Sequence, residues 1–470
     1  MKISYLFALL LLLCTASSHA QNNCNCAQAV EKLIAKIETE YPGFKEKTTD
    51  TLLYNHFKAG IIEKSWRTDD AHCLALLKEY TQFFKDRHIF FLDQTTPQPQ
   101  DKKAGKATVT ISAAAFHKKI STTKDPLEGI WKSDNYKIGI LKTDKTTYTG
   151  FILETNSQYW QPNDVKFVLH GTDRVDYYLQ DRSMFKDTFT LYSPAILYFR
   201  LLKSAFIKQP LLPADTLKIQ AQLNEIEGFY VKQLTPATTL LRLKSFDYPF
   251  VDRIEALIKA NRALIENSQN LIIDIRQNGG GTDLAYKPIL PYILTNPTLH
   301  TGATFLVTQT LLDGLEKYKK GLPRDEKHQA EIAGVDHQLN AFTGNIGKYI
   351  NPDEGESPVS KIAPALKSPQ QIVILTDRKV ASSAENFLLV AKQSKKVKVF
   401  GTPTSGVLDY GSARVFDMGC ANYPFVMPTY RSLRLPAYPI DNIGIQPDVY
   451  LDNYITDWMQ YAINYLEDKQ

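Results

Sequence analysis

Strong charge of one sign is missing from this sequence, and so is any long apolar run after its first twenty residues. The 470-residue chain carries 55 lysines and arginines against 50 aspartates and glutamates, which leaves a formal net charge of +5. So mild a balance gives no reason to expect a nucleic-acid partner. Because no segment after residue 20 is long and apolar enough to span a bilayer, we expect no membrane span either.

Cysteine is also scarce, with five in the whole chain, and the first of them lies in a stretch that is typical of an export signal. Residues 1–20 combine a positive start at Lys2, an apolar stretch over residues 7–13 and a small-residue cleavage site. Leucines rather than a small residue precede Cys14, so no lipid anchor is expected there. We therefore expect an exported protein, in a periplasm or outside the cell.

Four cysteines remain after the expected signal: Cys24, Cys26, Cys73 and Cys420. Export makes disulfides permissible, and four cysteines allow two bridges in three possible connectivities. A zinc site is the alternative, because His72 adjoins Cys73, but the spacing fits no standard zinc motif. We therefore expect no metal.

The remaining length of about 450 residues suggests two or three domains. Residues 21–92 are expected to be helical, since apolar residues recur there at the spacing of a helix with one buried face. Residues 93–106, rich in proline, glutamine and lysine, are expected to be a linker. In residues 107–205, short aromatic and β-branched runs alternate with polar positions, which predicts a small antiparallel sandwich or barrel.

Residues 206–470 are predicted to form an α/β domain. Nearly continuous apolar runs at 271–275, 372–375 and 397–400 are typical of strands that are covered on both faces. A polar, helix-prone stretch at about 310–365 is interpreted as an excursion over the edge of this domain. In open α/β sheets, ligand sites gather beyond the carboxyl ends of strands, so the segments that follow two of these runs are candidate sites.

The first such segment is Asp274-Ile-Arg-Gln-Asn-Gly-Gly-Gly281. Its three glycines permit left-handed backbone angles and let amide N–H groups approach a ligand closely. The Gly-Lys-Ser/Thr of a phosphate loop is missing, and Leu284 stands where a dinucleotide fingerprint needs its last glycine, so no nucleotide cofactor is expected. The segment is either a tight strand–helix turn or a donor loop that holds an oxyanion.

The second segment is Val380-Ala-Ser-Ser-Ala-Glu385, in which Ser382 lies three residues before Glu385. This S-x-x-E spacing is that of a helix capping box, and it is compatible with Ser382 acting as a nucleophile. A serine at a helix N-terminus lies among unpaired N–H groups at the positive end of the helix dipole. An oxyanion formed there would meet backbone donors, with Gly280 contributing another.

A neutral serine needs a base. Most of the nine histidines lie in loops or at isolated positions. His88 differs, because it follows a predicted helix in the charged turn Asp86-Arg87-His88, just before an apolar run. It is therefore the candidate base.

Together these stretches resemble the C-terminal processing peptidases, or tail-specific proteases, a group that includes the tricorn-core proteases and the retinoid-binding repeats. The resemblance covers roughly residues 220–470 and the helical segment that ends at His88. Residues 274–281 are similar to the family's D-x-R-x-N-x-G-G loop, residues 380–385 to its T-A-S-A-S-E motif, and residues 444–448 to its closing G-x-x-P-D.

The resemblance implies that Ser382 is the nucleophile and that the amides of Gly280 and Ser383 form the oxyanion hole. In the processing peptidases a lysine acts as the base, but Val407 occupies its place here, and valine cannot accept a proton. The tricorn-like branch uses a histidine instead, and His88 resembles the histidine of its D-x-H turn.

The tricorn group also has a serine beside that histidine, where this sequence has Arg87. The acid that would orient the base is therefore left open between Asp86 and Asp441. Residues 107–205 stand where the processing peptidases usually carry a PDZ domain. They contain no convincing carboxylate-binding loop, so recognition of a free C-terminus is not assumed.

The fold that the resemblance implies is α/β, a crotonase-like ββα serine-peptidase core with an N-terminal helical segment and an inserted all-β domain. The function that it implies is an exported serine peptidase that needs no cofactor and acts on a peptide or protein substrate. The alternative is a catalytically inactive protein on the same scaffold that binds a small molecule or a peptide. An esterase that uses the same residues is a third option.

Overall fold

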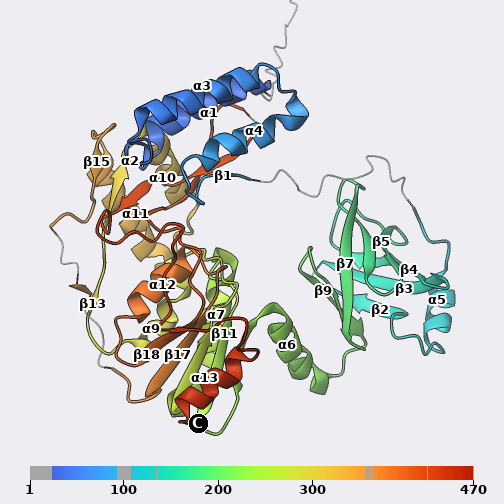
Figure 1. Ribbon diagram of the computed structural model, residues 1–470. Helices are drawn as coiled ribbons and strands as arrows, with labels where there is room; N and C mark the ends of the chain where they lie inside the picture. Colours follow the sequence, from blue (N-terminus) through green and yellow to red (C-terminus); the bar gives the residue numbers. More distant parts are fainter. Residues whose placement is uncertain are drawn as a thin grey trace, which may run out of the picture.

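The structure is a computed structural model, and it describes residues 24–92, 107–133, 135–355, 359–360, 365–420 and 422–468. Its elements form an N-terminal helical segment, a β-barrel and an α/β domain (Figure 1). The expected export signal and the expected linker lie outside the described residues. Within the described ranges, no helix is long and apolar enough to cross a membrane.

The N-terminal helical segment, residues 24–92, contains four helices. They are α1 (Cys26–Glu40), α2 (Phe44–Lys47), α3 (Thr51–Ser65) and α4 (Asp70–Gln82). Side-chain caps begin three of them: Asn25 accepts the N–H of Gln28 in α1, Asp50 that of Leu53 in α3, and Asp69 that of His72 in α4. The segment ends in strand β1 (Phe90–Phe91), which pairs antiparallel with β21 (Phe425–Met427) near the end of the chain.

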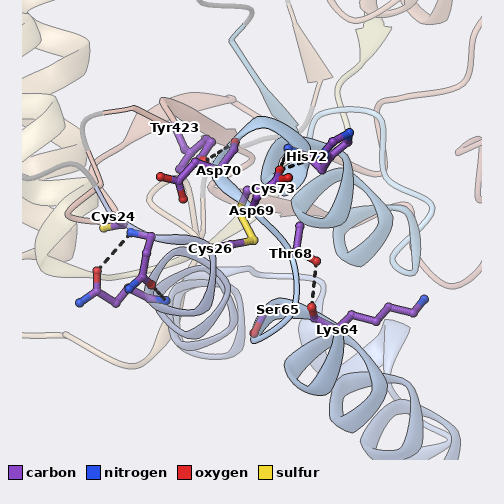
Figure 2. The surroundings of a disulfide bond; sticks show 12 residues. Cys24, Cys26, Lys64, Ser65, Thr68, Asp69, Asp70, His72, Cys73 and Tyr423 are labelled. Atoms are coloured by element: carbon purple, nitrogen blue, oxygen red, sulfur yellow. Dashed lines mark hydrogen bonds and ion pairs between the residues drawn. A yellow bond between two sulfur atoms is a disulfide. The ribbon is translucent and has the colours of Figure 1, made fainter.

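The helical segment shares one hydrophobic core with the C-terminal part of the chain. Buried side chains of its helices pack against buried residues between positions 410 and 427. One disulfide, Cys24–Cys420, ties the two parts together, and a second, Cys26–Cys73, joins α1 to α4 (Figure 2). The structure therefore has one of the three connectivities that the sequence left open, and it leaves no thiolate at Cys73 for a metal.

Eight antiparallel strands close into a barrel over residues 129–209. They are β2 (Gly129–Lys132), β3 (Tyr136–Asp144), β4 (Thr147–Thr155), β5 (Val165–His170), β6 (Arg174–Tyr178), β7 (Met184–Ser193), β8 (Ile196–Phe199) and β9 (Ser204–Gln209). Strand β2 pairs with both β3 and β9, which closes the barrel around an aromatic core. Of the two β architectures predicted for this region, the barrel is confirmed.

The α/β domain is built on a six-stranded sheet. In spatial order its strands are β10 (Phe229–Gln233), β11 (Thr238–Leu243), β12 (Asn270–Asp274), β17 (Gln371–Thr376), β18 (Val397–Gly401) and β23 (Val449–Tyr450). Only β10 and β11 pair antiparallel, and the other pairs in this sheet are parallel. The three strands predicted from continuous apolar runs are confirmed as β12, β17 and β18.

Both faces of this sheet are covered, which explains those continuous apolar runs. Leu271 and Ile273 enter the core formed with α7 (Val251–Ala260) and α12 (Ser383–Ala391), while Ile272 enters the opposite core. That opposite core is closed by α13 (Trp458–Leu466) (Figure 1). Two further helices, α10 (Gln309–Gly321) and α11 (Gln329–Phe342), pack together in the excursion between β12 and β17.

The two disulfides close chain segments of very different length, 396 and 47 residues, so their removal should have unequal effects. Loop-closure entropy predicts that losing Cys24–Cys420 lowers the free energy of unfolding by about 2 kcal/mol more than losing Cys26–Cys73. The measurement is urea unfolding of the double serine variant of each bridge. Equal losses, or a larger loss for the shorter bridge, would contradict the expectation.

Candidate active site

Ser382 lies at the carboxyl end of β17, immediately before the first residue of α12. Its backbone has φ 54° and ψ −125°, which a residue with a side chain rarely adopts and which lies outside the ordinary left-handed region. Such backbone strain persists only where the surroundings impose it, and it is concentrated at functional sites. The sequence indicated a capping serine, whereas the strained angles themselves had no sequence signal.

Glu385, one turn into α12, holds this bend. Its Oε2 accepts the N–H of Ser382 at 3.1 Å and the N–H of Val407 at 3.1 Å, and its Oε1 accepts the N–H of Gly406 at 2.7 Å. The side chain is fully buried, and burial raises the pKa of the carboxyl while these hydrogen bonds lower it. The glutamate of the predicted capping box therefore also ties the serine to the segment after β18.

The glycine loop after β12 lies against the bend. A Cβ added at Gly280, where φ is +90°, would lie 2.9 Å from both the Cβ of Ser382 and the N of Ser383, so only glycine fits there. Among the hydrogen bonds of the described residues, none uses the N–H of Ser383, whereas the N–H of Gly280 donates to Asn278 Oδ1 at 3.0 Å. Of the two backbone amides predicted to hold an oxyanion, that of Ser383 is thus free and that of Gly280 is already hydrogen-bonded.

His88 reaches the same place from the N-terminal helical segment. Its Nδ1 lies 2.7 Å from the backbone carbonyl oxygen of Tyr410, which can only accept a hydrogen bond. Nδ1 must therefore carry the proton, and Nε2 is left as the acceptor in the neutral ring. Asp86 fixes the turn rather than the ring: its Oδ1 accepts the N–H of His88 at 2.8 Å, and its Oδ2 accepts the hydroxyl of Tyr41 at 2.9 Å.

Asp441 does not contact the His88 ring either. Its Oδ1 accepts the N–H of Asp409, and its own N–H donates to Asp409 Oδ2, both at 2.9 Å. Lys47 Nζ lies 3.7 Å from Asp441 Oδ2. Burial, together with the charges of Asp86 and Asp409, raises the pKa of Asp441 to about 8. Asp86 and Asp441, the two acids considered for orienting the base, thus belong to a buried acidic cluster. The His88 ring instead donates its hydrogen bond to the backbone carbonyl of Tyr410.

One cavity of about 900 Å³, which we call the Ser382 cavity, is lined by Ser382, Ser383 and His88 but not by Gly280, Asp86 or Asp441. Its lining includes Arg87, His88, Gly279, Gly281, Asp283, Ala381, Ser382, Ser383, Ser405, Val407, Arg414 and Tyr430. Within the described part of the chain, no hydrogen bond joins the Ser382 hydroxyl to the His88 ring. The cavity therefore brings the predicted nucleophile and base together without a direct bond between them.

Two lining residues had no signal in the sequence. Arg87 appeared only as a departure from a motif, and its Nη1 donates to Ser405 Oγ at 2.8 Å. Arg414 matches no motif at all and lines the same cavity. Across the described ranges, no cluster of three or more histidine, cysteine, aspartate or glutamate side chains could hold a metal ion.

Comparison with known proteins supports a peptidase family for the α/β domain. Residues 237–451 match the family model described as "Peptidase family S41". No curated protein sequence matches the chain. The matched region contains Ser382, Ser383 and Gly280, while His88 lies outside it.

Several solved structures are also similar over most of the chain. One is mature CPAF (12 % identity, TM-score 0.49), which covers 95 % of this chain and 98 % of its own. Another is a photosystem II D1 C-terminal processing protease (12 % identity, TM-score 0.35; 91 % and 93 % covered), and a third is the tricorn protease (11 % identity, TM-score 0.39; 94 % and 37 % covered). At such identities and TM-scores these likenesses carry no conclusion about this chain.

The strain at Ser382 predicts an unusual order of stabilities. Glycine adopts positive φ without a steric cost, whereas alanine keeps the conflict. We expect Ser382→Gly to have a free energy of unfolding about 1 kcal/mol higher than Ser382→Ala. Urea unfolding of the two variants is the measurement. A glycine variant no more stable than the alanine variant would mean that the bend is not strained.

The raised pKa of Asp441 predicts a pH dependence of stability. Its ordinary value is 3.8, so between about pH 4 and pH 8 the folded protein binds more protons than the unfolded chain, and the free energy of unfolding falls as the pH rises. Asp441→Asn cannot ionise and keeps an oxygen to accept the N–H of Asp409. We expect the free energy of unfolding of the variant, taken relative to that of the wild type, to increase by roughly 1–3 kcal/mol between pH 5 and pH 8. A difference that does not change with pH in urea unfolding would contradict this.

Proposed function

We propose that this chain is an exported serine peptidase in which Ser382 is the nucleophile and His88 is the general base. The observation that carries the proposal is the common cavity, whose lining contains both a strained serine at a helix N-terminus, beside an unpaired amide, and a histidine with a fixed tautomer. The match of residues 237–451 to a peptidase family supports it. Within that family, we propose a crotonase-like core for the sheet and helices around Ser382.

The choice between the two adjacent serines rests on access. Both serines line the cavity, but Ser382 is partly exposed, whereas the Oγ of Ser383 is buried without a hydrogen-bond partner within the described ranges. A substrate carbonyl can therefore reach the Ser382 hydroxyl but not that of Ser383. The part proposed for Ser383 is its backbone N–H.

In the proposed reaction, Ser382 Oγ attacks the peptide carbonyl carbon, and His88 Nε2 takes the hydroxyl proton. The bond from His88 Nδ1–H to the Tyr410 carbonyl keeps the ring oriented while it becomes charged. His88 then gives the proton to the leaving amine, and a water molecule releases the acyl group by the same steps. The carbonyl oxygen, negative in the tetrahedral intermediate, accepts the free N–H of Ser383 at the positive end of α12.

Gly280 would be the second donor to this oxyanion. Its N–H points to Asn278 Oδ1, so the oxyanion has to share that hydrogen in a three-centre bond or displace the amide oxygen. Asn278 is itself anchored, because its Nδ2 donates to the carbonyl of Leu243 at 3.1 Å. Asn278 thus holds the glycine loop beside Ser382 before any substrate is bound.

Two further observations bear on the proposal. Val407 is buried and offers only its backbone N–H, to Glu385, so no amine stands where the processing peptidases have their lysine. The two disulfides are typical of proteins from oxidising compartments, which supports export to a periplasm or to the outside of the cell.

The second candidate is a protein on the same scaffold that binds a peptide or a small molecule without cleaving it. The missing bond between the Ser382 hydroxyl and His88 within the described residues favours it. Catalytic hydrogen bonds are often long in the absence of substrate, so the geometry is compatible with both functions.

A fluorophosphonate probe distinguishes a serine peptidase from a binding protein that does not cleave its ligand. We expect it to label the wild type and Ser383→Ala but not Ser382→Ala, because only Ser382 presents an activated hydroxyl. His88→Ala should slow both labelling and peptide turnover by about 10²–10⁴-fold, as expected for loss of a general base. Turnover of matched ester and amide substrates tells a peptidase from an esterase. Labelling that survives in Ser382→Ala, or hydrolysis that His88→Ala leaves unchanged, would overturn the assignment.

A further inference from the structure

Arg414 begins strand β20 (Arg414–Phe416) and lines the Ser382 cavity together with His88 and Ser382. Its side chain is partly buried, and its Nε is fully buried without a hydrogen-bond partner within the described residues. In the same part of the chain, it makes no ion pair and has no aromatic ring at cation–π distance. Arginine is always charged at ordinary pH, so this is an uncompensated cation in the cavity wall.

Other partly buried arginines of this protein are compensated. Six of them form ion pairs with carboxylates: Arg182, Arg242, Arg253, Arg276, Arg431 and Arg434. Burying a guanidinium without such a partner costs stability. The difference between Arg414 and these arginines therefore calls for an anion that is not part of the folded chain.

The residues around Arg414 provide no acid at the position of this anion. On one side is Gly314 of α10, where an added Cβ would lie 3.8 Å from Arg414 Cδ and 4.0 Å from its Nη1. Burial lowers the pKa of Arg414, and the groups that raise it are two tyrosines, Tyr248 and Tyr318, rather than an acid. The guanidinium is thus held between α10 and β20 with its charge unneutralised.

Positive charges outnumber negative ones in the lining of the cavity. Its charged lining residues, among those described, are Arg87, Arg414 and Asp283. The carboxylate of Asp283 accepts hydrogen bonds from Asn386 Nδ2 at 3.3 and 3.4 Å. Burial raises the pKa of Asp283, which disfavours its negative charge, and Arg87 adds a second positive charge, so the charged lining favours anions.

We propose that Arg414 binds a carboxylate of the substrate, so that the Ser382 cavity selects peptides with a carboxylate close to the bond that is cleaved. This inference rests on the proposed peptidase function of the same cavity. An unmodified peptide carries negative charge only as carboxylate, on aspartate and glutamate side chains or at its C-terminus. The guanidinium fork matches a carboxylate with two parallel hydrogen bonds. A cavity of about 900 Å³ holds only a short stretch of peptide, which places the carboxylate within a few residues of Ser382.

The test measures equilibrium binding of matched peptides to the full chain carrying Ser382→Ala, which cannot turn them over. Each pair differs only in aspartate against asparagine, glutamate against glutamine, or a free against an amidated C-terminus. We expect at least tenfold tighter binding of the acidic member of one kind of pair. That preference should disappear when Arg414→Gln is added and be reduced but still present with Arg414→Lys, which keeps the charge and loses the fork.

The kind of pair that shows the preference identifies the source of the carboxylate. Lys317→Gln is the matched control, because this exposed lysine lies beside Arg414 in a neighbouring pocket and does not line the Ser382 cavity. It should leave the preference unchanged. Thermal unfolding checks that the Arg414 variants fold.

An acidic preference that is absent, or that Arg414→Gln leaves intact, would overturn the inference. This outcome is distinct from failure of the proposed function, which fluorophosphonate labelling of the wild type reports independently. In active enzyme, the same Arg414→Gln change should lower kcat/KM at least tenfold for the preferred acidic peptide. For its uncharged match, kcat/KM should change by less than about threefold.

Discussion

The candidate site depends on the docking of the N-terminal helical segment against strands near the other end of the chain. His88 belongs to that segment, and the carbonyl that fixes its ring belongs to Tyr410. A shared apolar core, the pairing of β1 with β21 and the Cys24–Cys420 bridge hold the two parts together. Without this docking, the cavity would contain a serine at a helix N-terminus but no histidine.

A second constraint acts inside the α/β domain, where the carboxylate of Glu385 connects two loops. It accepts backbone N–H groups from Ser382 on one side and from Gly406 and Val407 on the other. Four hydrogen bonds, one of them from the hydroxyl of Thr404, satisfy a carboxylate that would otherwise be costly to bury. The strained angles of Ser382 are therefore imposed by a buried acid rather than by the serine itself.

The sequence predicted the parts of this arrangement that depend on local pattern. The strands β12, β17 and β18 followed from continuous apolar runs, and the cap at Glu385 followed from its spacing to Ser382. Contacts between distant segments could not be predicted in the same way. A backbone carbonyl such as that of Tyr410 has no residue type to mark it, and the engagement of the Gly280 amide by Asn278 depends on loop geometry. Arg414 is plain in the sequence as a cation, but only the fold shows that no acid of the described residues forms an ion pair with it.

The acids near His88 act without touching its ring. Burial raises the pKa of Asp86, while the charge of His88 and the hydrogen bonds from the N–H of His88 and the hydroxyl of Tyr41 lower it. These two hydrogen bonds hold Asp86 in the turn that carries His88, so this buried carboxyl positions the residue rather than its ring. In the proposed reaction the imidazolium forms as Ser382 attacks, and the carbonyl of Tyr410, which accepts the Nδ1–H, keeps the ring in place at that step. The ring is thus held by a backbone carbonyl rather than by an acid, while Arg87 and Arg414 line the same cavity, where the proposed carboxylate of the substrate would bind.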